Sequence, residues 1–296
     1  MMARLRTSSQ LRRLVNVGGA LLLILSIWLL VDTIEDVDPA ALLGSLGPSA
    51  AIKLVGFGAG YGVLLLLLVA AWRSSLFGAP LTAAAALAVY GTSILPKYLP
   101  GSVLQYGARQ LLGGREDLPQ RAVAAASTLE VGLHLAIPSV LLVPAYLFGP
   151  ITGLLAGVGL AACLAFTAIQ LPEGVWRGRA QAAVLQTLFF TGMAILVGGL
   201  AWTLGAEASL AAVLARAFLL AWLAGFVAPI APGGLGVREA AIAASVAPFA
   251  TAEITILFAA ATRIATLVGD LAVGGAGLLA LGHLRREPAS GSRVGS

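Results

Sequence analysis

Ionisable side chains inside long apolar segments are the residues of this chain that could do chemistry. Glu130 and His134 lie four residues apart in one such segment, and Arg263 and Asp270 lie seven apart in another. Both spacings place the two side chains on one face of a helix. A charge inside a membrane costs about 3 kcal/mol or more unless it is paired or hydrated, so each of these residues is a candidate site residue.

Two interpretations of these charges are open. In the first, Glu130–Arg263 and Arg238–Asp270 are buried ion pairs that hold the helices together. In the second, the same residues line a polar cavity. Glu130 with His134 could then also carry a proton, because a desolvated carboxyl group binds protons more readily than a hydrated one.

The apolar stretch of residues 227–244 reads V-A-P-I-A-P-G-G-L-G-V-R-E-A-A-I-A-A and is broken in its middle. Pro229 and Pro232 forbid a continuous helix, and the glycines that follow permit a backbone with positive φ. These glycines are Gly233, Gly234 and Gly236. Non-helical backbone at membrane depth persists only where protein or a watery cavity covers it. The helix that restarts there carries Arg238 and Glu239, and its free N–H groups beside a guanidinium favour an anion.

A second broken stretch lies earlier in the chain. Residues 81–95 and 102–112 are helices too short to cross a membrane, and P-K-Y-L-P-G separates them. We expect a re-entrant hairpin with Lys97 at its tip, although a broken full span is the alternative. Arg109 would bind the same anion or reach the interface. Gln105 and Tyr106 would donate hydrogen bonds to it.

Composition sets the membrane context. The 296 residues are 59% hydrophobic and 10% charged, with a mean hydropathy of +0.96, whereas a soluble domain is about a quarter charged. The basic residues lie at segment ends, which argues against nucleic-acid binding. A single cysteine excludes an intrachain disulfide. The sequence contains no residues with metal-ligand spacing and no hydrolase motif, so we expect no metal or cofactor. It also contains no Walker motif for ATP, so we expect any transport to be passive or driven by an ion gradient.

We therefore predict an all-α polytopic membrane bundle with six spans and two re-entrant hairpins. The spans are residues 14–31, 50–72, 122–148, 151–171, 182–204 and 254–282, and the arms of the second hairpin are 210–228 and 237–247. Residues 14–31 form a retained span, since no signal-peptide cleavage site follows. A short interfacial helix follows it, ending at Leu46. Residues 1–282 form one domain and 283–296 a disordered tail.

The distribution of charge orients this topology. Twelve of the 18 basic residues fall in loops and tails on one side, which the positive-inside rule assigns to the cytoplasm together with both termini. The hairpins then enter from opposite faces. This arrangement is typical of inverted-repeat transporters, although two Pro-Gly breaks could also coincide by chance.

Three motifs carry a resemblance to a known family. They are K-Y-L-P-G-x-x-x-Q-Y-x-x-R from Lys97, E-x-x-x-H from Glu130, and P-G-G-L-G-V-R-E-A around Arg238. The chain resembles, over residues 14–282, the flippase-like transmembrane family of lysylphosphatidylglycerol synthases. The family's middle motif reads E-R-x-x-D, whereas this chain has Val131 and His134 at those places. The soluble aminoacyl-transferase domain has no counterpart in this sequence, so the resemblance implies movement of a lipid and not its aminoacylation.

We expect a protein that binds the anionic head-group of a phospholipid or a polyprenyl-phosphate-linked lipid between the hairpin tips and moves it between leaflets. One alternative is an intramembrane transferase that acts on a lipid phosphate with Glu130 as base. Another is a non-catalytic partner of a membrane glycosyltransferase or lipid-modifying enzyme. A homo-oligomer is compatible with each. Arginine in excess of lysine, with abundant alanine and glycine, is typical of a GC-rich bacterial genome, which favours the inner membrane.

Overall fold

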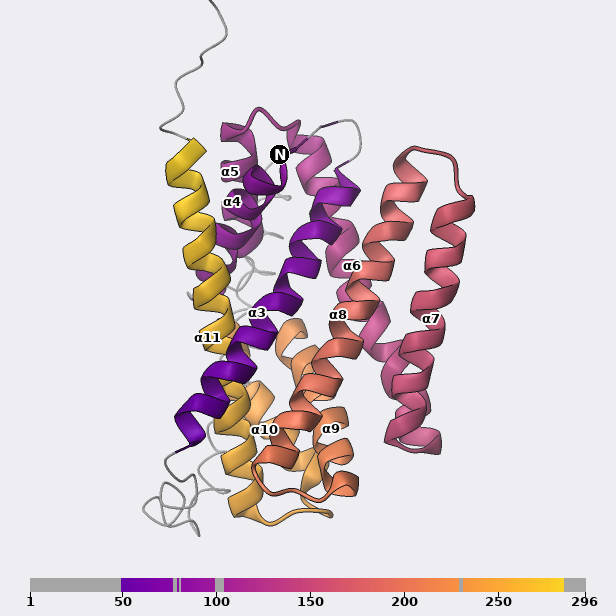
Figure 1. Ribbon diagram of the computed structural model, residues 1–296, viewed down its shortest axis with the longest axis vertical. Helices are drawn as coiled ribbons and strands as arrows, with labels where there is room; N and C mark the ends of the chain where they lie inside the picture. Colours follow the sequence, from indigo (N-terminus) through magenta and orange to yellow (C-terminus); the bar gives the residue numbers. More distant parts are fainter. Residues whose placement is uncertain (1–48, 77–78, 80, 99–103, 229–230, 285–296) are drawn as a thin grey trace, which may run out of the picture.

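The computed structural model describes residues 49–76, 79, 81–98, 104–228 and 231–284 of the chain. Every regular element in these ranges is a helix (Figure 1). The predicted span at residues 14–31, the interfacial helix that follows it, Pro229 and residues 285–296 of the predicted tail lie outside the described residues.

Six of the described helices are long and apolar enough to cross a membrane, which confirms an all-α polytopic bundle. They are α3 (Ala50–Ser75), α6 (Gln120–Phe148), α7 (Pro150–Gln170), α8 (Val175–Thr203), α9 (Ala208–Val227) and α11 (Ala252–Leu284). Five correspond to predicted spans, whereas α9 corresponds to the predicted first arm of the second hairpin. Helix α8 begins at Val175 rather than at residue 182, because its first two turns continue through Arg177 and Arg179.

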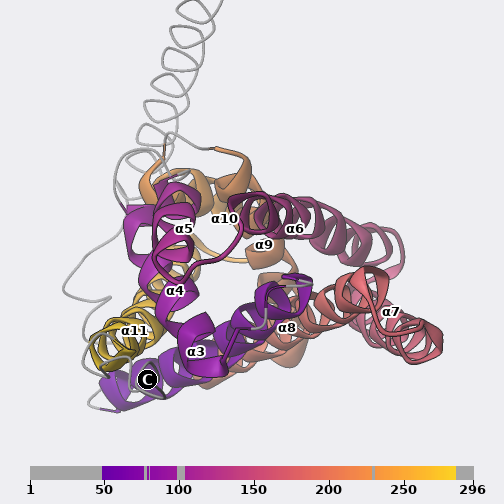
Figure 2. The ribbon, with the colours of Figure 1, turned by 90° about the horizontal axis from the view of Figure 1, so that it is seen from above.

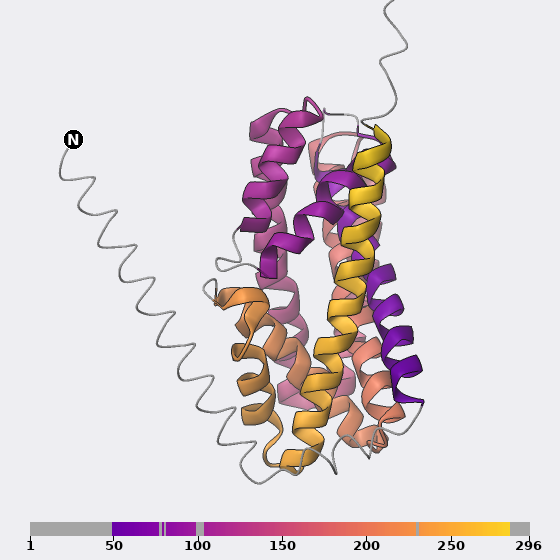
Figure 3. The same ribbon diagram turned by 90° about the vertical axis from the view of Figure 1, so that its left-hand side faces the viewer.

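Two hairpins enter the bundle from opposite ends and meet near its middle (Figure 3). The first consists of α4 (Ala83–Ile94), the 3-10 turn η1 (Leu95–Tyr98) and α5 (Leu104–Arg115). Helix α5 returns to the end from which α4 started, as a re-entrant hairpin does and a broken span does not. The second hairpin consists of α9, the turn η2 (Pro232–Gly234) and α10 (Val237–Val246), and the two turns contact each other.

The reversal at η2 depends on the predicted glycines. Gly233, Gly234 and Gly236 have φ values of 56°, 74° and 77°. A side chain in this left-handed region would cost about 1–2 kcal/mol. The proline and glycines of this segment therefore end α9, reverse the chain and start α10 within a few residues.

Helix α11 lies close to the first hairpin and to α3, and small residues allow this approach (Figure 2). A Cβ added at Gly277 would lie 2.5 Å from the backbone nitrogen of Thr92, and one at Gly269 would lie 2.7 Å from the carbonyl oxygen of Gly58. Glycine contacts of this kind let membrane helices pack with their backbones touching. The packing brings the charged residues of α11 to the level of the hairpin tips.

Arginines near the helix ends gather at one end of the bundle. The end of α3 and the α5–α6 and α7–α8 corners, at the upper end of Figure 1, carry Arg73, Arg115, Arg121, Arg177 and Arg179 together with the acidic residues Glu116, Asp117 and Glu173. The lower end carries Glu207 and Glu253, at the starts of α9 and α11. The arginines among these described residues therefore lie at the end that the sequence predicts to be basic.

Candidate functional site

A cavity of about 270 Å³ lies where the two hairpin tips meet. Its polar lining comes from both hairpins and from α3 and α6: Tyr61, Tyr90, Lys97, Gln105, Tyr106, Glu130, His134 and Arg238. Phe189, Trp222 and Phe226 form much of its apolar wall. The cavity therefore combines ionisable groups with aromatic rings deep inside a membrane bundle.

One wall contains a buried ion pair between α5 and α6. The Nη1 atom of Arg109 donates to Oε2 of Glu130 at 2.7 Å, and Tyr90 donates to Oε1 at 3.1 Å. The Arg109 side chain is 1% exposed and that of Glu130 is 6% exposed. The expected Glu130–Arg263 pair is therefore wrong, and so is the alternative that Arg109 reaches the interface. The first hairpin folds back against α6 and delivers its own arginine to this carboxylate.

Aromatic rings surround the Arg109 guanidinium. Its central carbon lies 4.0 Å from the ring centroid of Tyr90, 5.6 Å from that of Trp72 and 5.4 Å from that of Tyr106. Its Nε also donates to the hydroxyl of Ser93 at 3.2 Å. Cation–π contacts are strongest where the cation is desolvated, so these rings stabilise a charge that water does not reach.

His134 continues this wall toward α8. Its Nδ1 lies 3.0 Å from the carbonyl oxygen of Glu130 and 2.6 Å from Oε1 of Gln186. A carbonyl oxygen can only accept a hydrogen bond, so Nδ1 carries the proton and donates it. The ring packs among four aromatic side chains, those of Phe189, Phe190, Trp222 and Phe226. Nε2 is therefore the nitrogen that can accept a proton or a hydrogen bond.

The tip of the first hairpin is tied to α11. Lys97 Nζ lies 2.6 Å from Oδ2 of Asp270, and the hydroxyl of Tyr98 donates to the same oxygen at 2.5 Å. The Asp270 side chain is 2% exposed. The expected Arg238–Asp270 pair is therefore wrong, because α11 packs against the first hairpin and presents this carboxylate to its lysine.

The tip of the second hairpin is tied to the same helix. Arg263, seven residues before Asp270 on α11, donates from Nη1 to the carbonyl oxygen of Gly233 at 2.8 Å. Tyr98 of the first tip packs against Gly233 of the second tip, since a Cβ added at Gly233 would lie 3.1 Å from the Tyr98 ring. Arg263 and Asp270 therefore hold the two tips together from behind the cavity wall.

Arg238 differs from the other cations of the site. Among the described residues its guanidinium has no ion pair and donates no hydrogen bond, and its Nε is buried without a partner. The side chain passes between Gly225 and Gly234, where an added Cβ would lie 2.8 Å from Nε at either residue. Its guanidinium lies 5.6 Å from the ring centroid of Trp222. A half-buried cation without an ion pair, inside a membrane bundle, is complementary to an anion.

The backbone at the start of α10 adds to this complementarity. Gly236 occupies the N-cap position and supplies no side-chain cap, and Arg238 lies in the first turn. Free N–H groups at a helix N-terminus carry partial positive charge. Glu239 lies in the same turn, and its Oε2 is buried without a hydrogen-bond partner in the described part of the chain.

The structure brings most of the sequence-predicted site residues into this cavity. Eight of them line it: Lys97, Gln105, Tyr106, Glu130, His134, Gly233, Gly234 and Arg238. Five lie outside its lining, namely Arg109, Gly236, Glu239, Arg263 and Asp270. Sequence reasoning missed the aromatic wall of Trp222 and Phe226. Their spacing of four residues on an apolar helix gave no sign that they face a cavity rather than a helix interface.

Within the described ranges, no cluster of three or more His, Cys, Asp or Glu side chains could hold a metal ion. Comparisons with protein-family models, with curated proteins and with solved structures found no match to the chain. The site is therefore interpreted from its own geometry.

Proposed function

We propose that this chain binds the anionic head-group of a membrane lipid in the cavity between the hairpin tips and moves the lipid between leaflets. The observation that carries the proposal is Arg238, a half-buried cation that lines the cavity, has no ion pair among the described residues and has a buried Nε without a hydrogen-bond partner. Burying a cation in this way is costly unless a ligand or water offsets it. A phosphate would do so, because the planar guanidinium fork can donate two parallel hydrogen bonds to its oxygens.

The charges around the cavity support an anion over a cation as the ligand. Arg109 offsets Glu130 and Lys97 offsets Asp270, which leaves Arg238 outside the ion pairs with Glu239 in the same turn of α10. Arg263 adds a further positive charge behind the Gly233 turn, so positive charge exceeds negative charge around the tips. A lipid phosphate would accept from Arg238 and from the N–H groups at the start of α10, and Lys97 could exchange Asp270 for the same phosphate.

The arrangement of the hairpins supports movement between leaflets. Each hairpin leads from one end of the bundle to the central cavity, so a head-group there lies between the two ends. Secondary transporters built from inverted repeats place their substrate sites in the same way. The resemblance to the flippase-like family of lysylphosphatidylglycerol synthases points to the same substrate class. We assign the end rich in arginine to the cytoplasm of a bacterial inner membrane by the positive-inside rule.

The experiment that tests the proposal measures transfer of fluorescent phosphatidylglycerol between leaflets of proteoliposomes that contain the purified protein. An impermeant reductant bleaches the label in the outer leaflet only, so further bleaching reports translocation. Arg238→Gln should slow this transfer roughly ten- to hundredfold, since a hydrogen bond to a charged group contributes about 1.5–3 kcal/mol. Arg238→Lys should be intermediate, because lysine keeps the charge and lacks the fork.

Arg179→Gln is the matched control. Arg179 also contacts a tryptophan ring, at 4.8 Å from Trp176, but it lies at the end of the bundle and outside the cavity. This variant should translocate the lipid at the rate of the unsubstituted protein. Equal rates for Arg238→Gln and Arg179→Gln, with both proteins folded, would refute the proposal.

A further inference from the structure

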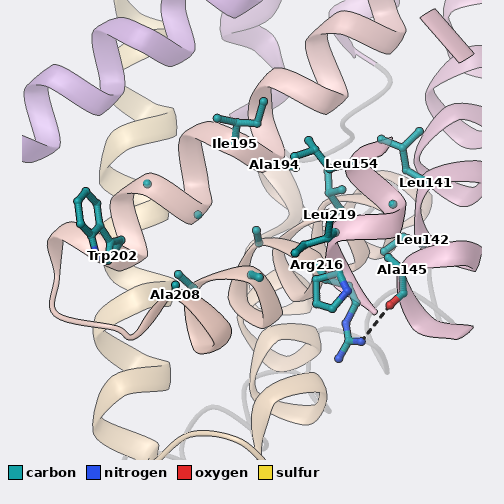
Figure 4. A pocket seen from close by; sticks show the side chains of 18 residues that line it. Leu141, Leu142, Ala145, Leu154, Ala194, Ile195, Trp202, Ala208, Arg216 and Leu219 are labelled. Carbon is teal, nitrogen blue, oxygen red and sulfur yellow. Dashed lines mark hydrogen bonds between the residues drawn. The ribbon is translucent and has the colours of Figure 1, made fainter. Parts of the chain in front are cut away.

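A second cavity, of about 370 Å³, lies at the periphery of the bundle between α6, α7, α8 and α9 (Figure 4). It shares no lining residue with the central cavity. Alanine, glycine and leucine side chains form most of its wall, and Arg216 is the one charged residue among the 18 that line it. We call this space the α8–α9 crevice.

The α8–α9 crevice opens toward the surroundings of the bundle. Ile151, Ile195 and Trp202 line it and are 68%, 58% and 68% exposed. Helix α7, which forms one side, lies at the outer edge of the bundle (Figure 2). In a membrane this surface faces lipid, so hydrocarbon chains have direct access to the crevice.

Arg216 lies at one end of the α8–α9 crevice, close to the corner between α6 and α7. Its Nη1 donates to the carbonyl oxygen of Ala145 at 3.3 Å (Figure 4), three residues before α6 ends. Its guanidinium lies 4.2 Å from the ring centroid of Tyr146. Its Nε is buried without a hydrogen-bond partner among the described residues, where no carboxylate pairs with Arg216 either. Tyr146 lies near the end of α6, where tyrosine is typical of the head-group level of a bilayer, and the long side chain of an arginine can extend to that level.

We propose that the α8–α9 crevice is a specific binding site for an anionic phospholipid, separate from the central cavity. One acyl chain lies in the apolar crevice, and the phosphate pairs with Arg216. Charge complementarity selects the occupant, since an apolar crevice that ends in a cation without a carboxylate partner matches a molecule with a hydrocarbon chain and a negative head. A partner helix fits the crevice less well than a lipid does. Such a helix is about 10 Å wide with its side chains and would need a groove that runs along a whole helix face.

The test is native mass spectrometry of the purified protein titrated with phosphatidylglycerol or with phosphatidylcholine of the same acyl chains. The titrations are made on Arg238→Gln, so that a head-group in the central cavity cannot account for the result. Adding Arg216→Gln should weaken binding of the tightest phosphatidylglycerol about tenfold, or about 1.4 kcal/mol, and weaken phosphatidylcholine less, because its choline partly neutralises the phosphate. Adding Arg216→Lys instead should retain the preference for the anionic lipid.

A second pair of variants tests the acyl-chain part of the site. Ala212→Phe fills the α8–α9 crevice and should remove the tightest lipid of either kind, whereas Ala260→Phe on the exposed face of α11 should not. Equal affinity for the two lipids, or an unchanged affinity for phosphatidylglycerol in Arg216→Gln, would overturn the proposal. A protein dimer that Ala212→Phe dissociates would also overturn it and would assign the crevice to a second copy of the chain.

Discussion

Breaking the Arg109–Glu130 pair should destabilise the bundle strongly. With these side chains 1% and 6% exposed, removal of either partner leaves a charge that water cannot reach. Breaking a buried pair of this kind costs about 3–5 kcal/mol. Arg109→Met also loses the hydrogen bond to Ser93 and the contact with the Tyr90 ring, and Glu130→Gln leaves the guanidinium uncompensated. We therefore expect each single variant to lower the free energy of unfolding by about 3–5 kcal/mol.

The double variant Arg109→Met/Glu130→Gln should be more stable than either single variant, because no unpaired charge remains buried. The assay is equilibrium unfolding in mixed micelles of a mild and a denaturing detergent, followed by tryptophan fluorescence. A loss below about 1 kcal/mol in Arg109→Met, or losses that simply add in the double variant, would refute this reasoning.

Two further predictions concern the cavity and the orientation of the chain. Gly225→Ala should displace the Arg238 side chain, since its Cβ would lie 2.7 Å from Cγ, and should slow lipid transfer roughly tenfold or more. Gly132→Ala, whose Cβ would meet nothing within 4 Å, is the control, and equal transfer rates would count against the site. In a Cys163→Ser background, an impermeant maleimide should label Glu253→Cys on intact cells and Arg177→Cys only after permeabilisation; the reverse pattern would invert the topology.

The sequence predicted the helices and the two hairpins well because single segments specify them. Hydropathy defines a span over about 20 residues, and Pro232 with the glycines that follow is sufficient to break one. The bounds of α6 and α11 accordingly fall within two residues of the prediction. The prediction at α8 missed two helical turns, because the arginines at its start resemble a loop in composition although they continue the helix.

The ion pairs could not be predicted in the same way. Helical spacing shows that Arg263 and Asp270 share a face, but it does not show which helix that face meets. Close packing at the glycines of α11 gives Asp270 to Lys97, and the return of α5 against α6 gives Glu130 to Arg109. The position of Arg238 outside the ion pairs is thus a property of the tertiary packing and not of the local sequence.

The measurement that tests the central claim most directly is photo-crosslinking with an anionic phospholipid that carries a diazirine on its head-group, followed by mass spectrometric mapping of the labelled residues. A head-group in the central cavity should label its lining, such as Tyr106, Trp222 and Phe226. Unlabelled lipid should compete for this labelling, and Arg238→Gln should abolish it. Labelling confined to the ends of the bundle, with none at these positions, would contradict the account.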